Sequence, residues 1–311
     1  MSWPPAMLGT VLLAAMLAVA APASAADDAD ICAKGLTEDA IAACTRVIKS
    51  GKWKGRGLAW AFANRGNGYV EKGQNDSALA DFNEAIRLDP KLAKSYNNRG
   101  IVWYAKGEDD RAVADYNEAI RLDPKHANAY NNRGIVWHAK GEDDRALADY
   151  NEAIGRDPKS DHAYFNRSAT RLYQGNEAGA LADISQASEL NPRKAYHAIW
   201  LDLIGQRNGV PSRLAEATAR LDMTVWPAPI IRMMLGQLTS EAAVAAADDP
   251  DAFRKHGHVC EVNFFAGELA LRRGNRQKAT ELFRMAAGDC PKTFVQYDAA
   301  RAELKALGET P

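Results

Sequence analysis

The chain has 311 residues, of which 47% are hydrophobic and 25% are charged, a composition typical of a globular protein. Its formal net charge is −1, and residues 195–311 carry 14 basic and 14 acidic side chains. Because no basic stripe is present, the electrostatic footprint of nucleic-acid binding is missing, and we expect no nucleic-acid partner.

The first 25 residues have the pattern of a secretory signal peptide. A short apolar run over residues 7–21 is followed by Ala23-Ser24-Ala25, which matches an Ala-x-Ala cleavage site. The run is shorter than the about 20 apolar residues that a membrane helix needs. Residues 1–6 carry no lysine or arginine, and an N-terminal anchor helix is the alternative. We expect a periplasmic or secreted protein with no membrane span after cleavage.

Residues 93–126 and 127–160 are one 34-residue unit written twice, with 27 of the 34 positions identical. A fixed period of this length is typical of a solenoid of antiparallel helix pairs, so we predict an all-α solenoid. The expected parts are a signal peptide at 1–25, a degenerate N-terminal unit at 26–58, four repeats at 59–92, 93–126, 127–160 and 161–194, an irregular helical connection at 195–259, a C-terminal repeat at 260–293 and a capping helix at 294–307.

Fixed positions within the unit, numbered from 1 at Ala93 or Ala127, have mechanical roles. Small residues at positions 8 and 20 let the two helices approach closely, and aromatic residues at positions 11 and 24 fill the space on either side. Glycine at position 15 supplies the turn, where a positive φ is cheap, and Pro at position 32 ends the second helix. The residues are Gly100, Trp103, Gly107, Ala112, Tyr116 and Pro124 in one unit, and Gly134, Trp137, Gly141, Ala146, Tyr150 and Pro158 in the next.

Together these residues resemble the tetratricopeptide repeat (TPR) family. The departure is arginine at position 7, where the family pattern has leucine. These arginines could bind acidic groups, but an aspartate recurs at position 23, and we favour structural ion pairs between helices. The arginines are Arg65, Arg99, Arg133 and Arg167, and the aspartates are Asp81, Asp115, Asp149 and Asp183.

An asparagine stands at position 6 of four successive units. In a TPR superhelix the first helices line the concave surface, so the resemblance implies a ladder of amides there. An amide offers donors and an acceptor, which suits an extended peptide backbone. The alternative is that the amides tie neighbouring helices together or are merely solvated. The ladder is Asn64, Asn98, Asn132 and Asn166, and its expected neighbours are Trp60, Asn97, Asn131, Tyr104, His138 and Phe165.

The connection after residue 194 breaks the repeat pattern. We expect helices over Tyr196–Ile204, from Pro211 through Leu221, over Ile230–Leu235 and over Ser240–Ala247, the last with Ser240 as its N-cap.

Four cysteines, an even number, suit disulfide pairing in an exported chain. Cys32 and Cys44 fall at positions 12 and 24 of the N-terminal unit, which face each other across the hairpin. Cys260 and Cys290 fall at positions 1 and 31 of the C-terminal unit, where the start of one helix lies beside the end of the other. We predict the disulfides Cys32–Cys44 and Cys260–Cys290, since both pairs can reach the Cα separation of about 4.4–6.8 Å that the bond requires.

His256, His258 and Cys260 are spaced two residues apart and could bind a transition metal. The sequence shows no fourth ligand at a suitable spacing. We therefore predict no metal site and no cofactor.

The second half resembles the NlpI-type periplasmic TPR lipoproteins. The residues that carry this resemblance are Tyr196-His-Ala-Ile-Trp-Leu, Leu235-Gly236, Thr239-Ser-Glu, Asn263-Phe-Phe-Ala-Gly-Glu and Phe294-Val-Gln-Tyr297 with Ala302-Glu-Leu. Members of that family are non-enzymatic adaptors that dimerise and bring substrates to a periplasmic protease and to peptidoglycan hydrolases. The resemblance therefore implies protein partners of this kind and a homodimer. This chain lacks the lipid-attachment cysteine.

The function that we expect from the sequence is an exported, non-enzymatic scaffold that binds peptide segments of cell-envelope proteins in its concave groove. The alternative is a structural or carbohydrate-binding role at the cell wall, through exposed aromatic residues. An enzyme would need a nucleophile and base in the insertion at residues 195–257, whose only histidines are His197 and His256, with no partner suggested by spacing. We expect no catalytic residues.

Overall fold

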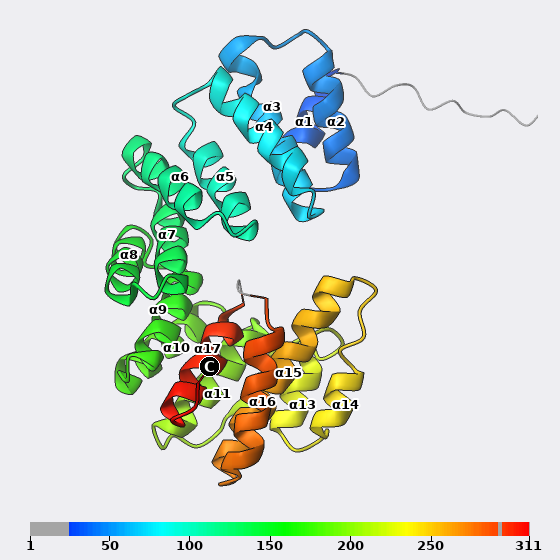
Figure 1. Cartoon of the computed structure of the whole chain (residues 1–311). Coiled ribbons are helices and arrows are strands. Elements are labelled where there is room, and N and C mark those ends of the chain that lie inside the picture. The colour runs from blue at the N-terminus through cyan, green and yellow to red at the C-terminus, as the bar shows by residue number, and fades with distance from the viewer. Residues whose placement is uncertain (1–24, 292–293, 311) are drawn as a thin grey trace, which may run out of the picture.

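The computed structural model describes residues 25–291 and 294–310, and shows an array of antiparallel helix pairs (Figure 1). The expected signal peptide lies outside the described residues, except for Ala25. The first ten helices are α1 (Ala25–Lys34), α2 (Glu38–Lys49), α3 (Ala59–Glu71), α4 (Asn75–Leu88), α5 (Ala93–Ala105), α6 (Asp109–Leu122), α7 (Ala127–Ala139), α8 (Asp143–Arg156), α9 (Asp161–Tyr173) and α10 (Glu177–Leu190), with a 3-10 helix η1 (Gly55–Leu58) before α3.

The C-terminal half is also helical. Its elements are α11 (Ala195–Arg207), α12 (Leu214–Ala217), the 3-10 helix η2 (Thr218–Arg220), α13 (Ala228–Met234), α14 (Ser240–Ala245), α15 (Ala252–Arg272), α16 (Arg276–Asp289) and α17 (Val295–Ala306). No strand occurs in the described ranges, which confirms the predicted all-α solenoid. None of the helices in this part of the chain combines the length and apolar character needed to cross a membrane.

A glycine packed against an aromatic ring sets the separation of the helices in most pairs. A Cβ atom at Gly134 would lie 2.7 Å from the ring of Tyr150, which is only 1% exposed. The same contact joins Gly66 to Phe82, Gly100 to Tyr116 and Gly267 to Phe283. The predicted turn glycines have positive φ, for example 75° at Gly141. The repeat frame therefore holds on both sides of the irregular connection.

One arginine per repeat joins three helices. The Nε and Nη2 groups of Arg133 donate to the two Asp149 oxygens at 2.7 and 2.6 Å, and Nη1 donates to Asn117 Oδ1 at 2.6 Å on the preceding α6. The predicted structural ion pairs are thus present, and each also reaches back to the previous repeat. Equivalent sets are Arg65 with Asp81 and Thr45, Arg99 with Asp115 and Asn83, and Arg167 with Asp183 and Asn151.

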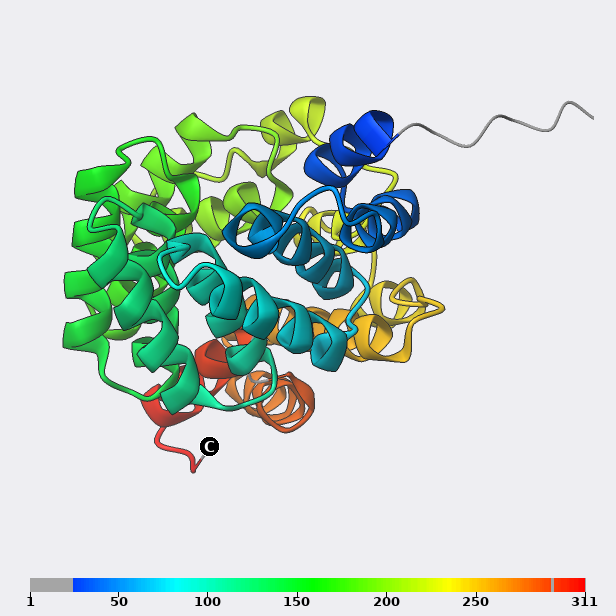
Figure 2. The ribbon, with the colours of Figure 1, turned by 90° about the horizontal axis from the view of Figure 1, so that it is seen from above.

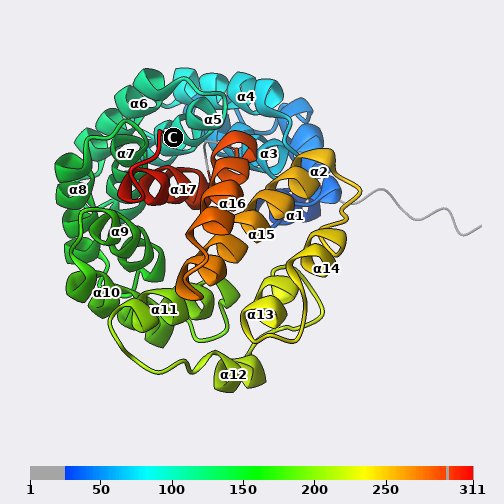
Figure 3. The ribbon, with the colours of Figure 1, turned by 60° about the horizontal axis from the view of Figure 1, so that its bottom comes forward.

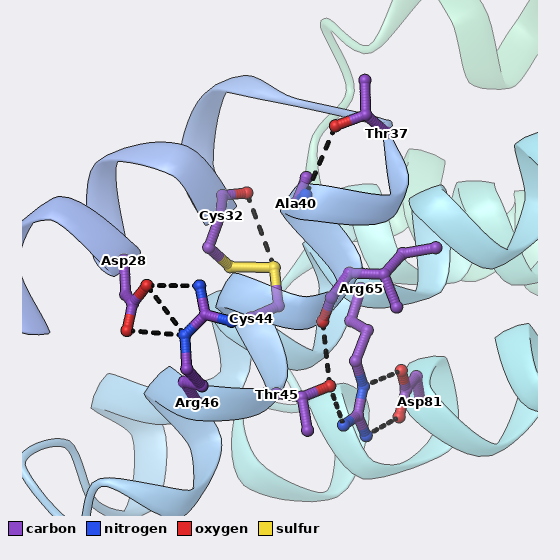
Figure 4. The surroundings of a disulfide bond; sticks show 10 residues. Asp28, Cys32, Thr37, Ala40, Cys44, Thr45, Arg46, Arg65 and Asp81 are labelled. Atoms are coloured by element: carbon purple, nitrogen blue, oxygen red, sulfur yellow. Dashed lines mark hydrogen bonds and ion pairs between the residues drawn. A yellow bond between two sulfur atoms is a disulfide. The ribbon is translucent and has the colours of Figure 1, made fainter. Parts of the chain in front are cut away.

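Both predicted disulfides are present. Cys32–Cys44 joins α1 to α2 with a Cα separation of 4.7 Å, beside the two-oxygen contact of Arg46 with Asp28 (Figure 4). Cys260–Cys290 joins α15 to the end of α16, with a Cα separation of 5.1 Å. Each bond stabilises a unit that has a helix pair on one side only.

The pairs curve into a superhelix whose inner surface is formed by α3, α5, α7 and α9 (Figure 3). The second helices α4, α6, α8 and α10 lie outside. The chain then turns back, and α15, α16 and α17 lie inside the ring of repeats in Figure 3, whereas in Figure 2 these orange and red helices lie along the lower edge of the ribbon. Helix α17 also contacts α9. The final helix therefore does more than cap the last pair, because it enters the concave side of the repeats.

The connection differs from expectation at its helix boundaries. Helix α15 begins at Ala252, so the expected boundary at Cys260 falls inside it; the Asp251 side chain caps it by accepting from the Arg254 N–H at 2.8 Å. The predicted N-cap at Ser240 was wrong by one residue, since Thr239 accepts from Ala242 at 3.2 Å.

Two of the shorter helices are also displaced from their expected starts. Helix α12 begins at Leu214 rather than at Pro211. Helix α13 begins at Ala228, which leaves Pro229 in its first turn, where the missing N–H costs no intrahelical bond.

A half-buried arginine, whose side chain is 24% exposed, holds α17 in place. Arg207 on α11 donates through Nη2 to Glu268 on α15 at 2.7 Å and to Glu303 on α17 at 2.6 Å. Both carboxylates are buried, at 2% and 6% exposure. Because breaking a buried ion pair leaves an uncompensated charge, this cluster fixes α17 against the C-terminal core.

We predict that Gly134→Ala destabilises the protein and that Gly155→Ala does not. The new methyl group at position 134 overpacks the buried Tyr150 ring, at a cost of about 1–3 kcal/mol. A Cβ at Gly155 in α8 meets nothing within 4 Å, so the gain of up to about 1 kcal/mol in helix propensity is realised there. Urea unfolding of both variants measures the difference. Equal stabilities would contradict the proposed role of the glycine–ring contact.

Candidate functional site

The asparagines of the first helices form one chain of hydrogen bonds along the inner surface. Asn166 Nδ2 donates to Asn131 Oδ1 at 2.9 Å, Asn132 Nδ2 to Asn97 Oδ1 at 3.0 Å, and Asn98 Nδ2 to Asn67 Oδ1 at 2.7 Å. Neighbouring amides within a helix complete the chain, since Asn131 donates to Asn132 at 3.4 Å and Asn97 to Asn98 at 2.9 Å. We call these six residues the asparagine chain.

The ends of the asparagine chain follow from position 5 of each repeat. The repeats at 93 and 127 have Asn97 and Asn131 there, which accept from the next repeat. The first repeat has Ala63 at this position, and Asn98 donates instead to Asn67, one turn further along α3. The fourth repeat has Phe165, so the chain ends at Asn166. Asn64 does not take part, although sequence spacing placed it in the ladder.

The hydrogen bonds of the asparagine chain agree with the structural alternative for the ladder. The amides tie successive repeats together, as in the structural alternative. Each amide has two N–H donors and an oxygen with two lone pairs. Every member of the chain except Asn67 donates one of its two N–H groups to another member. The hydrogen bonds within the chain do not use the remaining N–H donors and lone pairs.

The asparagine chain forms one wall of an open groove of about 830 Å³. The opposite wall comes from α11, α15 and the start of α17. The amide wall contains Asn97, Asn98, Asn131, Asn132 and Asn166 with Ile101, Ile135 and Phe165, and the opposite wall contains Tyr196, His197, Trp200, Arg254, His258, Glu261, Phe294, Val295 and Gln296.

The start of α17 separates this groove from a smaller cavity of about 230 Å³. Tyr104 and His138, both expected beside the ladder, line that smaller cavity together with Asp298 of α17. Burial raises the pKa of the Asp298 carboxyl to about 6. The residues expected beside the ladder are therefore distributed over two cavities of the concave surface.

Of the two other aromatic residues expected beside the ladder, one lines the cavities and the other does not. Phe165 lines both cavities and stacks on the His197 ring at 5.4 Å. Trp60 lines neither, because it packs edge-on against Trp53 at 6.0 Å in the N-terminal unit.

Aromatic side chains that line the groove also pack against one another. Phe165 meets Trp200 edge-on at 6.1 Å, and Trp200 stacks on Phe264 at 5.8 Å. His197 is 1% exposed, and burial lowers its pKa to about 4. The Nε1 group of Trp200 and the Nδ1 atom of His197 are buried with no hydrogen-bond partner in the described part of the chain.

Glu261 on α15 is the ionisable residue of the site that the sequence analysis missed. Its carboxylate is 4% exposed and accepts from Tyr196 OH at 2.8 and 2.9 Å and from Trp226 Nε1 at 2.7 Å. Burial raises its pKa to about 7. A signal was available, since Glu261 is a single acid within the otherwise uncharged run 256–267.

Other candidate chemistry in the sequence has structural roles. The Cys260 sulfur lies in a disulfide and His258 stacks on Trp226 at 4.0 Å, so the His-x-His-x-Cys run does not form a ligand set. The residues that the structure describes contain no group of three or more side chains able to hold a metal. The repeat aromatics are core residues, with Tyr116 and Tyr150 buried and Trp137 covered by Arg145.

We predict that Glu261→Gln changes the pH dependence of stability. The pKa of Glu261 is raised from 4.5 to about 7, so folding favours its neutral form. The stabilising contribution is complete below about pH 4.5 and is lost as the pH rises through about 7. The wild type should therefore lose on the order of 3 kcal/mol relative to the variant between about pH 4.5 and 8.

Urea unfolding of both proteins across this range measures the effect. The altered hydrogen bonding of the glutamine shifts the free energy of unfolding by an amount that does not depend on pH. The other carboxyl groups with raised pKa values are present in both proteins, so their effects cancel in the comparison. Parallel stability curves would show that Glu261 titrates normally.

Comparison with known proteins identifies the repeats. A model described as TPR repeat matches residues 66–107 and 102–141, and a tetratricopeptide repeat model matches residues 127–160. The pilF structure from Pseudomonas aeruginosa is similar, with a TM-score of 0.50 and 18% identity over 80% of this chain and 100% of its own. A tetratricopeptide repeat protein from Parabacteroides merdae has a TM-score of 0.51 and 16% identity, over 90% of this chain and 94% of its own. Both likenesses concern the fold alone. Residues 66–160 are therefore tetratricopeptide repeats, within an array of the same hairpins that extends on both sides.

Proposed function

We propose that this protein is a non-enzymatic scaffold that binds extended peptide segments of other proteins in the groove beside the asparagine chain. The observation that carries the proposal is the row of amides with unused hydrogen-bonding capacity. An extended peptide presents alternating N–H and C=O groups, and primary amides can pair with both.

The groove has the mixed character that a peptide site needs. Polar amides lie on one wall, while Ile101, Ile135, Phe165 and Trp200 supply apolar contact for side chains. Its volume of about 830 Å³ is within the range of small-ligand pockets, so it accommodates a few residues rather than a folded domain. The partner would therefore contribute a short segment.

We further propose that the protein acts in the cell envelope after export. The signal-peptide pattern supports this setting, and so do two disulfides, which persist in oxidising compartments. The resemblance to NlpI-type lipoproteins suggests a periplasmic protease or peptidoglycan hydrolases as partners, and a homodimer as the assembly. Pull-down from a periplasmic extract, followed by sedimentation with cell walls, separates protein partners from wall binding.

The non-enzymatic assignment is part of the proposal. All four cysteines are paired, which removes the thiol nucleophiles. His197 in the connection is buried against Phe165, and burial holds its pKa low. These features suit a packing role better than a base.

We predict that Asn98→Ala with Asn132→Ala weakens binding of a fluorescent random dodecapeptide pool, measured by anisotropy. Each lost hydrogen bond contributes about 0.5–1.5 kcal/mol, so the double variant should bind roughly 5- to 100-fold more weakly. Gln74→Ala, an exposed amide on the turn before α4, is the control and should bind as the wild type does.

Helical content should change little in the double variant, and the melting temperature should fall moderately, because both side chains also bond the preceding repeat. A collapse of the transition would assign the amides to structure alone, and unchanged affinity with an intact fold would rule out the groove as the binding site.

A further inference from the structure

Resting on the proposed peptide binding, we propose that Glu261 recognises a basic side chain of the bound segment, through its ammonium or guanidinium group. Glu261 lies on α15, in the wall of the groove opposite the asparagine chain. A peptide held on the amides would therefore direct side chains toward it.

Glu261 differs from the other buried carboxylates in lacking a cation. Glu268 and Glu303 share Arg207, Asp202 lies 3.8 Å from Arg272, and each aspartate of the repeats has its own arginine. Those repeat aspartates are Asp81, Asp115, Asp149 and Asp183, and Asp28 pairs with Arg46. Among residues 25–291 and 294–310, no lysine, arginine or histidine forms an ion pair with Glu261, whose partners are two neutral donors.

The Glu261 carboxylate has lone pairs that its two donors do not use. A carboxylate offers about four lone-pair sites. Tyr196 OH bridges both oxygens and Trp226 Nε1 donates to Oε2, which leaves acceptor capacity on Oε1. A buried charge without a counter-charge is costly, so a cation that completes this site would bind favourably.

The surroundings suit the stem of a lysine or arginine as well as its head. The apolar Trp200 and Phe294 line the same groove and can contact the methylene groups. Two cations of the protein also line the groove, but Arg254 is paired with Asp249 at 3.1 Å and Lys194 lies against His162. Both are more solvent-exposed than Glu261, so their charges are screened more strongly.

Binding of a basic segment should depend on pH. A ligand cation favours the charged carboxylate, so affinity should fall as the pH drops through about 7, the pKa to which burial raises Glu261. The other titratable or charged groups of the groove are His162, Lys194, His197, Arg254 and His258, with Tyr196 in direct contact and Asp298 in the adjoining cavity. Burial lowers the pKa of His197 to about 4 and that of His258 as well, and it raises the pKa of Asp298 to about 6.

The test uses three fluorescent pools of random dodecapeptides that differ only in a fixed central residue, which is lysine, norleucine or glutamate. At about pH 8 the wild-type protein should bind the lysine pool about tenfold or more tightly than the norleucine pool, because a hydrogen bond to a charged group is strong. This preference should disappear near pH 5.5 and in Glu261→Gln. Tyr196→Phe removes one donor to the carboxylate and should move the midpoint of the pH dependence upward.

Glu142→Gln, a partly exposed acid that lines neither cavity, and Asp298→Asn are the controls, and both should retain the preference. Equal binding of the lysine and norleucine pools by the wild type, or a preference for glutamate, would overturn this inference but leave peptide binding intact. A lysine preference that persists in Glu261→Gln would also overturn it. Binding of no pool would overturn both the inference and the proposed function. The pH series on the wild type does not depend on the folding of any variant.

Discussion

The arginine at position 7 of each repeat is the interaction on which the solenoid depends. It holds the aspartate of its own second helix and a side chain of the preceding second helix, as Arg133 holds Asp149 and Asn117. The contact therefore fixes both the hairpin and its orientation to its neighbour. Because the bond repeats every 34 residues, it also sets the register in which Asn132 reaches Asn97. The asparagine chain follows from this geometry.

The C-terminal half converts an open concave surface into a bounded site. Arg207 fixes α17 to α11 and α15, and the start of α17 then lies between the groove and the smaller cavity. Without the C-terminal half, a bound peptide would contact only the amide wall. Here the second wall adds the buried Glu261 to the groove, which is the basis of our proposal that the site selects for charge as well as for extended backbone.

Sequence periodicity predicted the repeat hairpins, the turn glycines and both disulfides, because each depends on contacts within one 34-residue unit. It did not predict the second wall. Glu261 meets Tyr196 across 65 residues, and Arg207 meets Glu303 across 96, through a connection with no repeat to set its register. The asparagine chain contains Asn98, Asn132 and Asn166, which position 6 singled out, but at its end Asn67 stands in place of Asn64 because position 5 of the first repeat is Ala63. Peptide binding by these amides stays a prediction.

The most direct test of the central claim is a photo-cross-link from within the groove. A benzoylphenylalanine at position 135, where Ile135 lines both cavities, is compared with one at position 285, where Met285 is 48% exposed on α16 and lines neither. After irradiation with the random dodecapeptide pool, mass spectrometry should find peptide adducts at position 135 and not at position 285. Equal labelling at the two positions, or adducts at position 285 alone, would contradict the assignment of the groove as the peptide-binding site.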